Sequence, residues 1–420
     1  MRRPQAPLLF QQKMPGSEKN GYFFLYLRMV TYISATYIYT VSGPVLKNGV
    51  LAVDAKGVIK KVYTEQEAKD QKIADIQHYK GVLVPGFINT HCHLELSNLK
   101  GMIPKRTGLP EFVKSVIKLR TSDEYELNLE LLKADIEMYE NGIVAVGDIS
   151  NQLVSRALKL TSPVHYLTFL EVMGFNPASA KDAMKRAKEF KDEFDPLPVS
   201  IVPHAPYSVS ADLLHELSEY AELNGGPISI HNQETRDENA FFERNEGEFP
   251  GLFEFLGQDI SFYKPTGKTS LQSYLPLLSP KVKVLLVHNT YTSADDVAYA
   301  KSIHPNLYWC LCPNANLYIE NKLPDVNMLR EADLKITIGT DSLASNNWLN
   351  ILWEINLLQE KFGVPTEELL TWATLNGAEF LGVEERYGSL EEGKRPGINL
   401  IDFEEVDGQV VLGMCVKRLF

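Results

Sequence analysis

Polar side chains that can bind a metal follow apolar runs along this chain. His91 and His93 come directly after the run VLVPGFINT, and one residue separates them. In an extended strand, residues i and i+2 point to the same side, so both imidazoles can reach one cation while Cys92 points the other way. The H-x-H spacing alone is a weak motif, because two polar residues can follow a strand without sharing a role.

Further candidates lie at the ends of other apolar runs. His204 follows VSIVP, His231 and Glu234 lie in HNQE, His288 follows VLLV, and Asp341 follows KITIGT. Five of the nine histidines fall at such ends. Imidazole nitrogen together with carboxylate oxygen suits zinc, iron(II) or another divalent transition ion, and does not suit calcium or magnesium. The set predicts a site for such an ion, with zinc preferred and iron(II) as the alternative.

Eight apolar runs predict the strands that would position these side chains. Each run leads into a longer stretch with helical spacing. Continuous apolar runs suit parallel strands buried on both faces, and about 260 residues for eight such units match an α/β fold of the (β/α)8 TIM-barrel type. The carboxyl ends of barrel strands meet on one face, where active sites are built. A doubly wound open sheet is the rival, but no G-x-G-x-x-G follows any run. The runs begin at residues 82, 142, 164, 199, 227, 282, 307 and 335.

The two ends of the chain predict a second, smaller domain. Residues 29–81 and 386–420 alternate strand-forming residues with turn signals such as KNG, AKG and DG, the pattern of antiparallel hairpins. We expect the two segments to build one small β-sandwich domain, with residues 82–385 as the barrel. We expect residues 1–28 to be a disordered extension, with Met29 as the natural start.

Composition limits the classes of partner. The formal net charge is −12 and no basic stripe is present, which argues against nucleic acid. The apolar stretch from residue 22 to residue 41 contains Arg28 and then becomes rich in Tyr, Thr, Ile and Val, so we expect a strand there and no membrane contact. Four scattered cysteines are too few for a disulfide framework and predict a cytoplasmic protein.

The motifs together carry a family resemblance. From about residue 30 to residue 420 the chain closely resembles the amidohydrolase superfamily, in particular its aminohydrolase branch of deaminases and chlorohydrolases. It is similar there to nucleoside deaminases such as aminofutalosine or S-adenosylhomocysteine deaminase, although the loop TGLPEFVKSVI departs from a close match. The motifs are PGFINTHCH, HAPYSVS, HNQE, VHNT, CPNANLYIENKLPDV and GTDSLASNN, followed by the tail ATLNGAEFLGVEERYGSLEEGKRPGINLI.

The resemblance implies a mononuclear metal site with a water in the open position. Relatives with two metals usually bridge them with a carboxylated lysine at the end of strand four. His204 ends that strand here, which argues for one metal. The implied ligands are His91, His93, His231 and Asp341.

The resemblance also implies catalytic roles. Asp341 would accept the proton of the water, His288 would orient the attacking hydroxide, and Glu234 would protonate a ring nitrogen beside the carbon under attack. Each role has a plain alternative. Glu234 lies in an acidic run, where a solvated carboxylate is the ordinary case, and Asp341 can serve as a helix N-cap.

Six polar residues near the predicted strand ends are candidates for substrate contact. His204 resembles a histidine that related deaminases direct at the substrate, but it can also be a structural strand-end residue. An arginine among the candidates can pair with a substrate carboxylate or only with acidic neighbours at the surface. The candidates are His204, Glu95, Ser97, Arg106, Glu171 and Arg236.

The predicted function is a metal-dependent hydrolase of non-peptide C–N bonds. We expect it to be a cyclic amidine deaminase that releases ammonia from an amino-substituted N-heterocycle, such as a purine or a nucleoside-like compound. The alternative is hydrolysis of another C–N or C–Cl bond, as in a chlorohydrolase or a cyclic amidohydrolase. A catalytically silent binding relative is disfavoured because all four implied ligands are present. The expected partner is a small-molecule substrate, with a homodimer as a candidate assembly.

Overall fold

The computed structural model describes residues 30–120 and 123–420. The extension predicted for residues 1–28 lies outside these described residues. Within them, none of the helices combines the length and the apolar character needed to cross a membrane.

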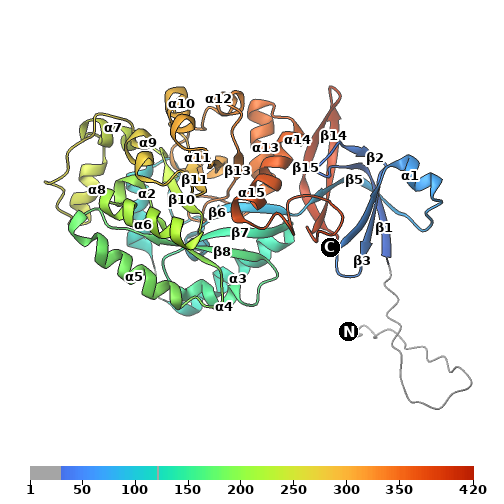
Figure 1. The fold of residues 1–420 in the computed structure, drawn as a ribbon, viewed down its shortest axis with the longest axis horizontal. Helices are drawn as coiled ribbons and strands as arrows, with labels where there is room; N and C mark the ends of the chain where they lie inside the picture. Colours follow the sequence, from blue (N-terminus) through green and yellow to red (C-terminus); the bar gives the residue numbers. More distant parts are fainter. Residues whose placement is uncertain (1–29, 121–122) are drawn as a thin grey trace, which may run out of the picture.

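Eight parallel strands form the wall of a barrel in the larger part of the molecule (Figure 1). They are hydrogen-bonded as two four-stranded sheets, in the orders β6-β7-β8-β9 and β10-β11-β12-β13. The strands are β6 (Phe87–Cys92), β7 (Ile143–Ser150), β8 (His165–Val172), β9 (Val199–Pro203), β10 (Ile228–Asn232), β11 (Val284–His288), β12 (Leu307–Leu311) and β13 (Ile336–Ile338).

Two contacts join these sheets at their carboxyl ends. Cys92 and Asp341 form a parallel bridge between the ends of β6 and β13. On the other side, the amide of His231 in β10 donates to the carbonyl of His204, just beyond β9, at 3.0 Å. The predicted TIM-type barrel is confirmed, and both contacts involve residues of the predicted site.

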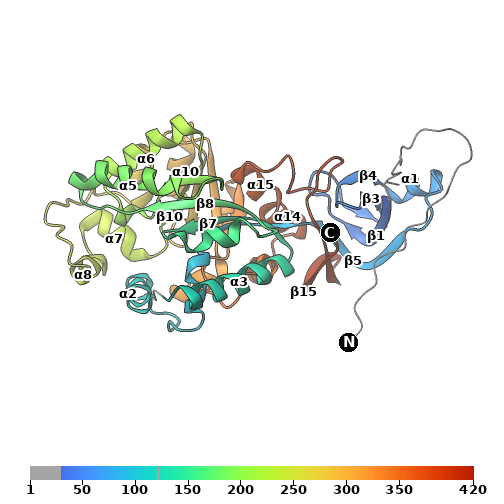
Figure 2. The ribbon, with the colours of Figure 1, turned by 90° about the horizontal axis from the view of Figure 1, so that it is seen from below.

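Helices pack around the barrel and over its carboxyl end (Figures 1 and 2). Helix α6 shows why such helices form. Ser210 caps the first turn of α6 by accepting from the amide of Leu213. The buried face of the helix carries Leu213, Leu217 and Ala221 at helical spacing, and Gly225 ends the helix in the left-handed conformation. The helices are α2 (Leu109–Leu119), α3 (Glu124–Glu140), α4 (Arg156–Lys159), α5 (Ala180–Asp192), α6 (Ala211–Asn224), α7 (Arg236–Arg244), α8 (Phe249–Phe255), α9 (Ser270–Tyr274), α10 (Ala294–Ile303), α11 (Pro313–Ile319), α12 (Val326–Glu331), α13 (Ile351–Phe362), α14 (Thr366–Ala373) and α15 (Leu375–Leu381).

Both ends of the described chain contribute to a second sheet beside the barrel (Figure 1). This sheet has seven strands in the order β15-β14-β5-β1-β3-β4, and β2 pairs with β1. A short helix, α1 (Glu65–Asp70), follows β4. The strands are β1 (Val30–Ile38), β2 (Leu46–Lys47), β3 (Val50–Asp54), β4 (Ile59–Tyr63), β5 (Gln77–Pro85), β14 (Ile398–Val406) and β15 (Gln409–Arg418).

The apolar run that begins at residue 82 is divided between the two sheets. Its first residues complete β5, which pairs with β1 and β14, and the barrel wall begins at Phe87. Gly86 separates the two strands, and a Cβ atom there would lie only 2.3 Å from Cγ1 of Val144. Glycine therefore allows the chain to pass from one sheet into the other without displacing β7.

Candidate active site

Three imidazole rings meet where β6 and β10 end. His91 lies in β6, His93 follows that strand, and His231 lies in β10. Nε2 of His93 is 3.1 Å from Nε2 of His91 and 3.3 Å from Nε2 of His231. The carboxylate of Asp341 completes the group, with Oδ1 3.5 Å from Nε2 of His93 and 3.7 Å from Nε2 of His91. All four side chains are buried.

Four of the six separations among these atoms match those around one tetrahedral metal ion. Nitrogen and oxygen ligands about 2.1 Å from zinc, at tetrahedral angles, lie about 3.4 Å from one another. The measured separations run from 3.1 to 3.7 Å. Burial lowers the pKa of His93 to about 3 and the pKa of His231 well below its ordinary value, so both rings are neutral at pH 7. Neutral imidazole is the form that binds metals.

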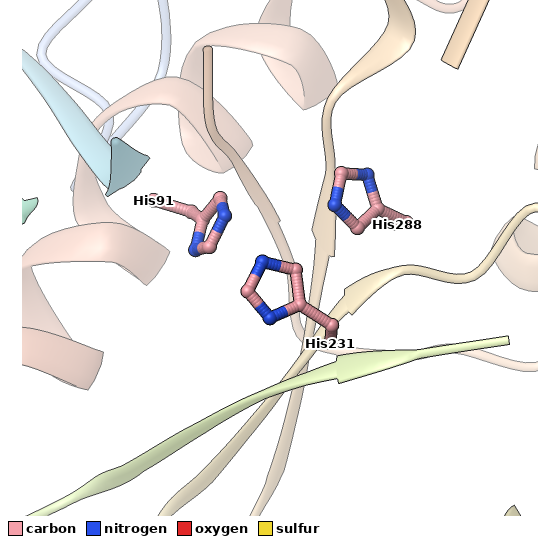
Figure 3. Close-up of side chains that lie close together, drawn as sticks. All are labelled: His91, His231 and His288. Carbon is pink, nitrogen blue, oxygen red and sulfur yellow. The ribbon is translucent and has the colours of Figure 1, made fainter. Parts of the chain in front are cut away.

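Hydrogen bonds behind the rings orient two of the histidines. Nδ1 of His231 donates to the backbone carbonyl of His204 at 2.7 Å, which leaves the lone pair of Nε2 free for the site. His288, which ends β11, donates in the same way from Nδ1 to Oδ1 of Asn316 at 2.8 Å. The rings of His91, His231 and His288 face a common space (Figure 3). His231 and His288 therefore both present an unprotonated nitrogen there.

Strained backbone accompanies the side chains at these strand ends. Gln233, His288 and Asp341 have positive φ angles of 45°, 77° and 55°. Residues with a Cβ rarely adopt this region, which costs on the order of 1–3 kcal/mol for each of them. The amide of Asp341 donates to the carbonyl of His91 at 3.1 Å, and Oδ2 of Asp341 accepts from Ser345 Oγ at 2.5 Å. These bonds hold the strained end of β13 against the end of β6.

Glu234 lies two residues beyond β10, with its side chain buried in the same cavity. Its Oε2 is 3.6 Å from Nε2 of His288. Burial raises the pKa of Glu234 well above its ordinary value, with a further rise from the negative charge of Asp341. Burial therefore favours the protonated form of this carboxyl group, which is the form that a general acid requires.

Two more carboxylates line the cavity, and their hydrogen bonding differs. Glu95 accepts from Arg120 and from the amide of Asn151 at 2.9 Å. Glu171, in β8, accepts from the side-chain amide of Asn151 at 3.0 Å, while its Oε1 has no hydrogen-bond partner among the described residues. Burial raises the pKa of Glu171 to about 7. Glu95 is thus engaged by protein groups at both oxygens, whereas Oε1 of Glu171 is buried 3.6 Å from Nδ1 of His231 without a hydrogen bond to the described part of the chain.

The remaining candidates for substrate contact divide into one that lines the cavity and three that do not. His204 lines it, with Nδ1 2.7 Å from Ser208 Oγ. Ser97 instead donates to the carbonyl of Leu94 at 2.7 Å, within the 3-10 helix Leu94–Leu99. Arg106 is exposed in a turn, and the side chain of Arg236 is 81% exposed at the start of α7. Local sequence position did not reveal that these three side chains point away from the cavity.

The cavity continues from the histidines into an apolar half, with a total volume of about 390 Å³. Helix α2 forms much of this half. Most of its residues fall in the segment TGLPEFVKSVI, whose sequence departs from a close family match. Arg120 is the only permanently cationic side chain among the lining residues, all of which belong to the described chain, and it is paired with Glu95. The apolar lining includes Leu109, Phe112, Val113, Val116, Phe175, Leu252 and Phe253.

Sequence reasoning missed several buried residues that support the site. Asp148 lies near the carboxyl end of the apolar strand GIVAVGDIS, so a search for polar residues near strand ends would have found it. Glu354 lies on α13, where no strand-end signal exists. Its carboxylate accepts from the side-chain amide of Asn346 at 2.8 Å and from the amide of Asn314 at 2.9 Å. Glu354 thereby connects the loop that contains Asp341 to α11, the helix on which Asn316 accepts from His288.

Comparison with known proteins agrees with this geometry. Adenosine deaminase of Helicobacter pylori is 27% identical over 359 residues, covering 80% of this chain and 86% of that protein. The 5-methylthioadenosine/S-adenosylhomocysteine deaminase of Bacillus cereus is 26% identical over 393 residues, covering 89% and 85%. The crystal structure of Helicobacter pylori aminofutalosine deaminase with methylthio-coformycin matches with a TM-score of 0.76 and 25% identity, covering 93% of this chain and 100% of that one.

A family model supports the same relationship over most of the chain. The model of the amidohydrolase family matches residues 82–416, which span the whole barrel and most of the strands β14 and β15. The resemblance seen in the motifs is thereby confirmed. The chain belongs to the amidohydrolase family.

Proposed function

We propose that this protein is a metal-dependent deaminase that hydrolyses an amino-substituted N-heterocycle, a purine or nucleoside-like cyclic amidine, and releases ammonia. The observation that carries the proposal is the convergence of His91, His93, His231 and Asp341 on one point beside the protonated carboxyl of Glu234. The relatives named for deamination of adenosine and methylthioadenosine support the same reaction class.

In this proposal one zinc ion is the cofactor, with iron(II) as the alternative. His91, His93, His231 and Asp341 hold the ion, because four of the separations between their Nε2 and Oδ1 atoms, from 3.1 to 3.7 Å, match a tetrahedral site. When bound, the divalent metal supplies Lewis acidity, which lowers the pKa of water toward about 7.

The residues of the chain supply the proton transfers. Asp341 accepts the proton of the attacking water, and its hydrogen bond from Ser345 holds the carboxylate in place. Nε2 of His288 accepts a hydrogen bond from the same water, because Nδ1 is already engaged by Asn316. Glu234 gives its proton to the ring nitrogen beside the carbon under attack, so that no uncompensated negative charge develops on the ring. The amino group then leaves as ammonia after a second protonation.

The shape of the cavity supports a substrate with an apolar substituent. The histidines and carboxylates occupy one half, and the side chains of α2 and α8 line the other. A nucleoside whose ring reaches Glu234 would extend its sugar substituent into the apolar half. We therefore propose that 5′-methylthioadenosine is a better substrate than adenosine, because the methylthio group buries apolar surface where a hydroxyl would lose hydrogen bonds to water.

The test combines metal content with product release. The purified protein is expected to carry close to one zinc or iron per chain and to release ammonia from 5′-methylthioadenosine with a higher kcat/KM than from adenosine. A chlorinated triazine is included so that chloride release can be measured in parallel. Chloride release without ammonia release from any purine would favour the chlorohydrolase reaction instead. A folded protein that binds no transition metal would refute the proposal.

We also propose that the protein works in the cytoplasm. Its four cysteines are all free, and three of them are buried in the barrel. Free thiols are ordinary in a reducing compartment.

A further inference from the structure

A fully buried ion pair lies beneath the site, outside the cavity. Asp148 lies two residues before the end of β7 and Lys159 ends α4, with Lys159 Nζ 2.6 Å from Asp148 Oδ2 and no exposure of either side chain. The ammonium also donates to Ser150 Oγ at 3.0 Å and to Thr168 Oγ1 at 2.9 Å. All three of its N–H donors therefore have acceptors.

The second oxygen of Asp148 binds the chain segment that carries the two histidines. Oδ1 accepts from the amide of Leu94 at 2.8 Å, and Leu94 directly follows His93. This bond supplements a weak point in the sheet, because the pairing of β6 with β7 changes register between Asn89 and Cys92. The regular ladder therefore does not fix the backbone where the histidines lie.

Stability alone does not account for this pair. Removing two charges from water costs several kcal/mol for each ion, and apolar side chains of similar size are often as stable or more stable in such places. A buried pair is instead well suited to fixing one geometry. The ammonium holds Oδ2, which leaves Oδ1 aimed at the amide of Leu94.

We propose that Asp148 is a positioning residue for the metal site, and that Lys159 holds it in place. Asp148 fixes the backbone that follows His93, so that the rings of His91 and His93 keep their separation of 3.1 Å between Nε2 atoms. Neither residue lines the cavity, so neither contacts the substrate. This inference rests on the metal-binding part of the proposed function.

The test measures zinc affinity, with Zn²⁺ alone titrated into metal-free protein in competition with a fluorescent chelator. The double variant Asp148→Leu/Lys159→Met removes both charges and the acceptor for Leu94. We expect its zinc affinity to fall roughly 10- to 100-fold, the usual effect of losing a group that orients metal ligands. The matched variant Asp148→Asn/Lys159→Met also removes both charges but keeps an acceptor oxygen, and we expect its affinity to stay within about threefold of the wild type.

Two further variants separate positioning from general destabilisation. Thr168→Val removes one acceptor of Lys159 and leaves the bond to Leu94, so the melting temperature should fall while the zinc affinity does not. Asp148→Glu keeps the charge but moves the carboxylate by one methylene, and it should lose affinity even if the Leu/Met variant does not fold. Wild-type zinc affinity in every folded variant at residue 148 would overturn the inference. A wild-type protein that binds no zinc would instead overturn the proposed function.

Discussion

At the scale of single residues, the protonation states of the cavity follow from burial. Burial lowers the pKa of His204 and of His288 to about 4, which makes both rings hydrogen-bonding groups without charge at pH 7. The same burial raises the pKa of Glu234 well above its ordinary value. One environment therefore produces neutral bases and a neutral acid side by side, which is the combination that proton transfer to a heterocycle requires.

Glu234→Gln tests this assignment. The amide keeps the shape of the side chain but cannot give up a proton, so kcat should fall by roughly 10²- to 10⁴-fold. Metal content, measured by elemental analysis, should not change, because Glu234 is not among the four converging ligands. Arg236→Gln is the matched control, since that side chain is 81% exposed, and its activity should equal that of the wild type. Full activity in Glu234→Gln would show that another group donates the proton.

At the scale of elements, we expect substrate specificity to depend on the helices that cover the carboxyl end of the barrel. Helix α2 packs against α8, and together they close the apolar half of the cavity. One face of α2 carries Leu109, Phe112, Val113 and Val116, which repeat at helical spacing and line this half. The barrel strands position the proposed catalytic groups, and we expect α2 to determine which substituents fit beside them.

Val116→Asp is the change that tests the role of α2. A carboxylate in the apolar half should disfavour the methylthio group, so the ratio of kcat/KM for 5′-methylthioadenosine to that for adenosine should fall roughly tenfold. Ser115→Asp places the same carboxylate one residue away on a side chain outside the cavity lining, and it should leave the ratio unchanged. An equal effect of both substitutions would mean that α2 does not contact the substituent.

At the scale of the whole molecule, the barrel and the second sheet are tied together at the start of the barrel wall. Asn399 in β14 donates to the carbonyl of Gly142 at 2.9 Å, and Arg418 in β15 donates to the carbonyl of Ile143 at 3.2 Å. Both acceptors lie where β7 begins, and Asp148 lies near the other end of that strand. Because β5 also continues into β6 across Gly86, the second sheet supports the two strands on which the site depends.

Metal binding should therefore stabilise the whole fold. A ligand that binds only the folded state at 100 times its Kd contributes about 2.7 kcal/mol. At roughly 1–2 °C per kcal/mol for a chain of this size, zinc should raise the melting temperature by about 3 to 5 °C above that of chelator-treated protein. His93→Ala is the control, and its melting temperature should not respond to zinc at these concentrations. An unchanged wild-type melting temperature would argue that the four side chains do not share an ion.

Much of the site was accessible from the sequence because its residues obey one positional rule. His91, His231 and His288 each follow a continuous apolar run, and in a barrel such ends must meet on one face. The sequence by itself therefore determined the barrel and the ligand types that suit a divalent metal, and it predicted Glu234 beside them.

Only the tertiary structure decided which polar residues reach the cavity and what lines its other half. Ser97 and Arg236 each lie only two residues beyond Glu95 and Glu234, yet a 3-10 helix and the start of α7 direct their side chains elsewhere. Val116 lines the cavity, and Lys159 pairs with Asp148 beneath it, only because segments far apart in the chain pack together. Side-chain direction and long-range packing depend on the folded backbone, and no local pattern encodes them.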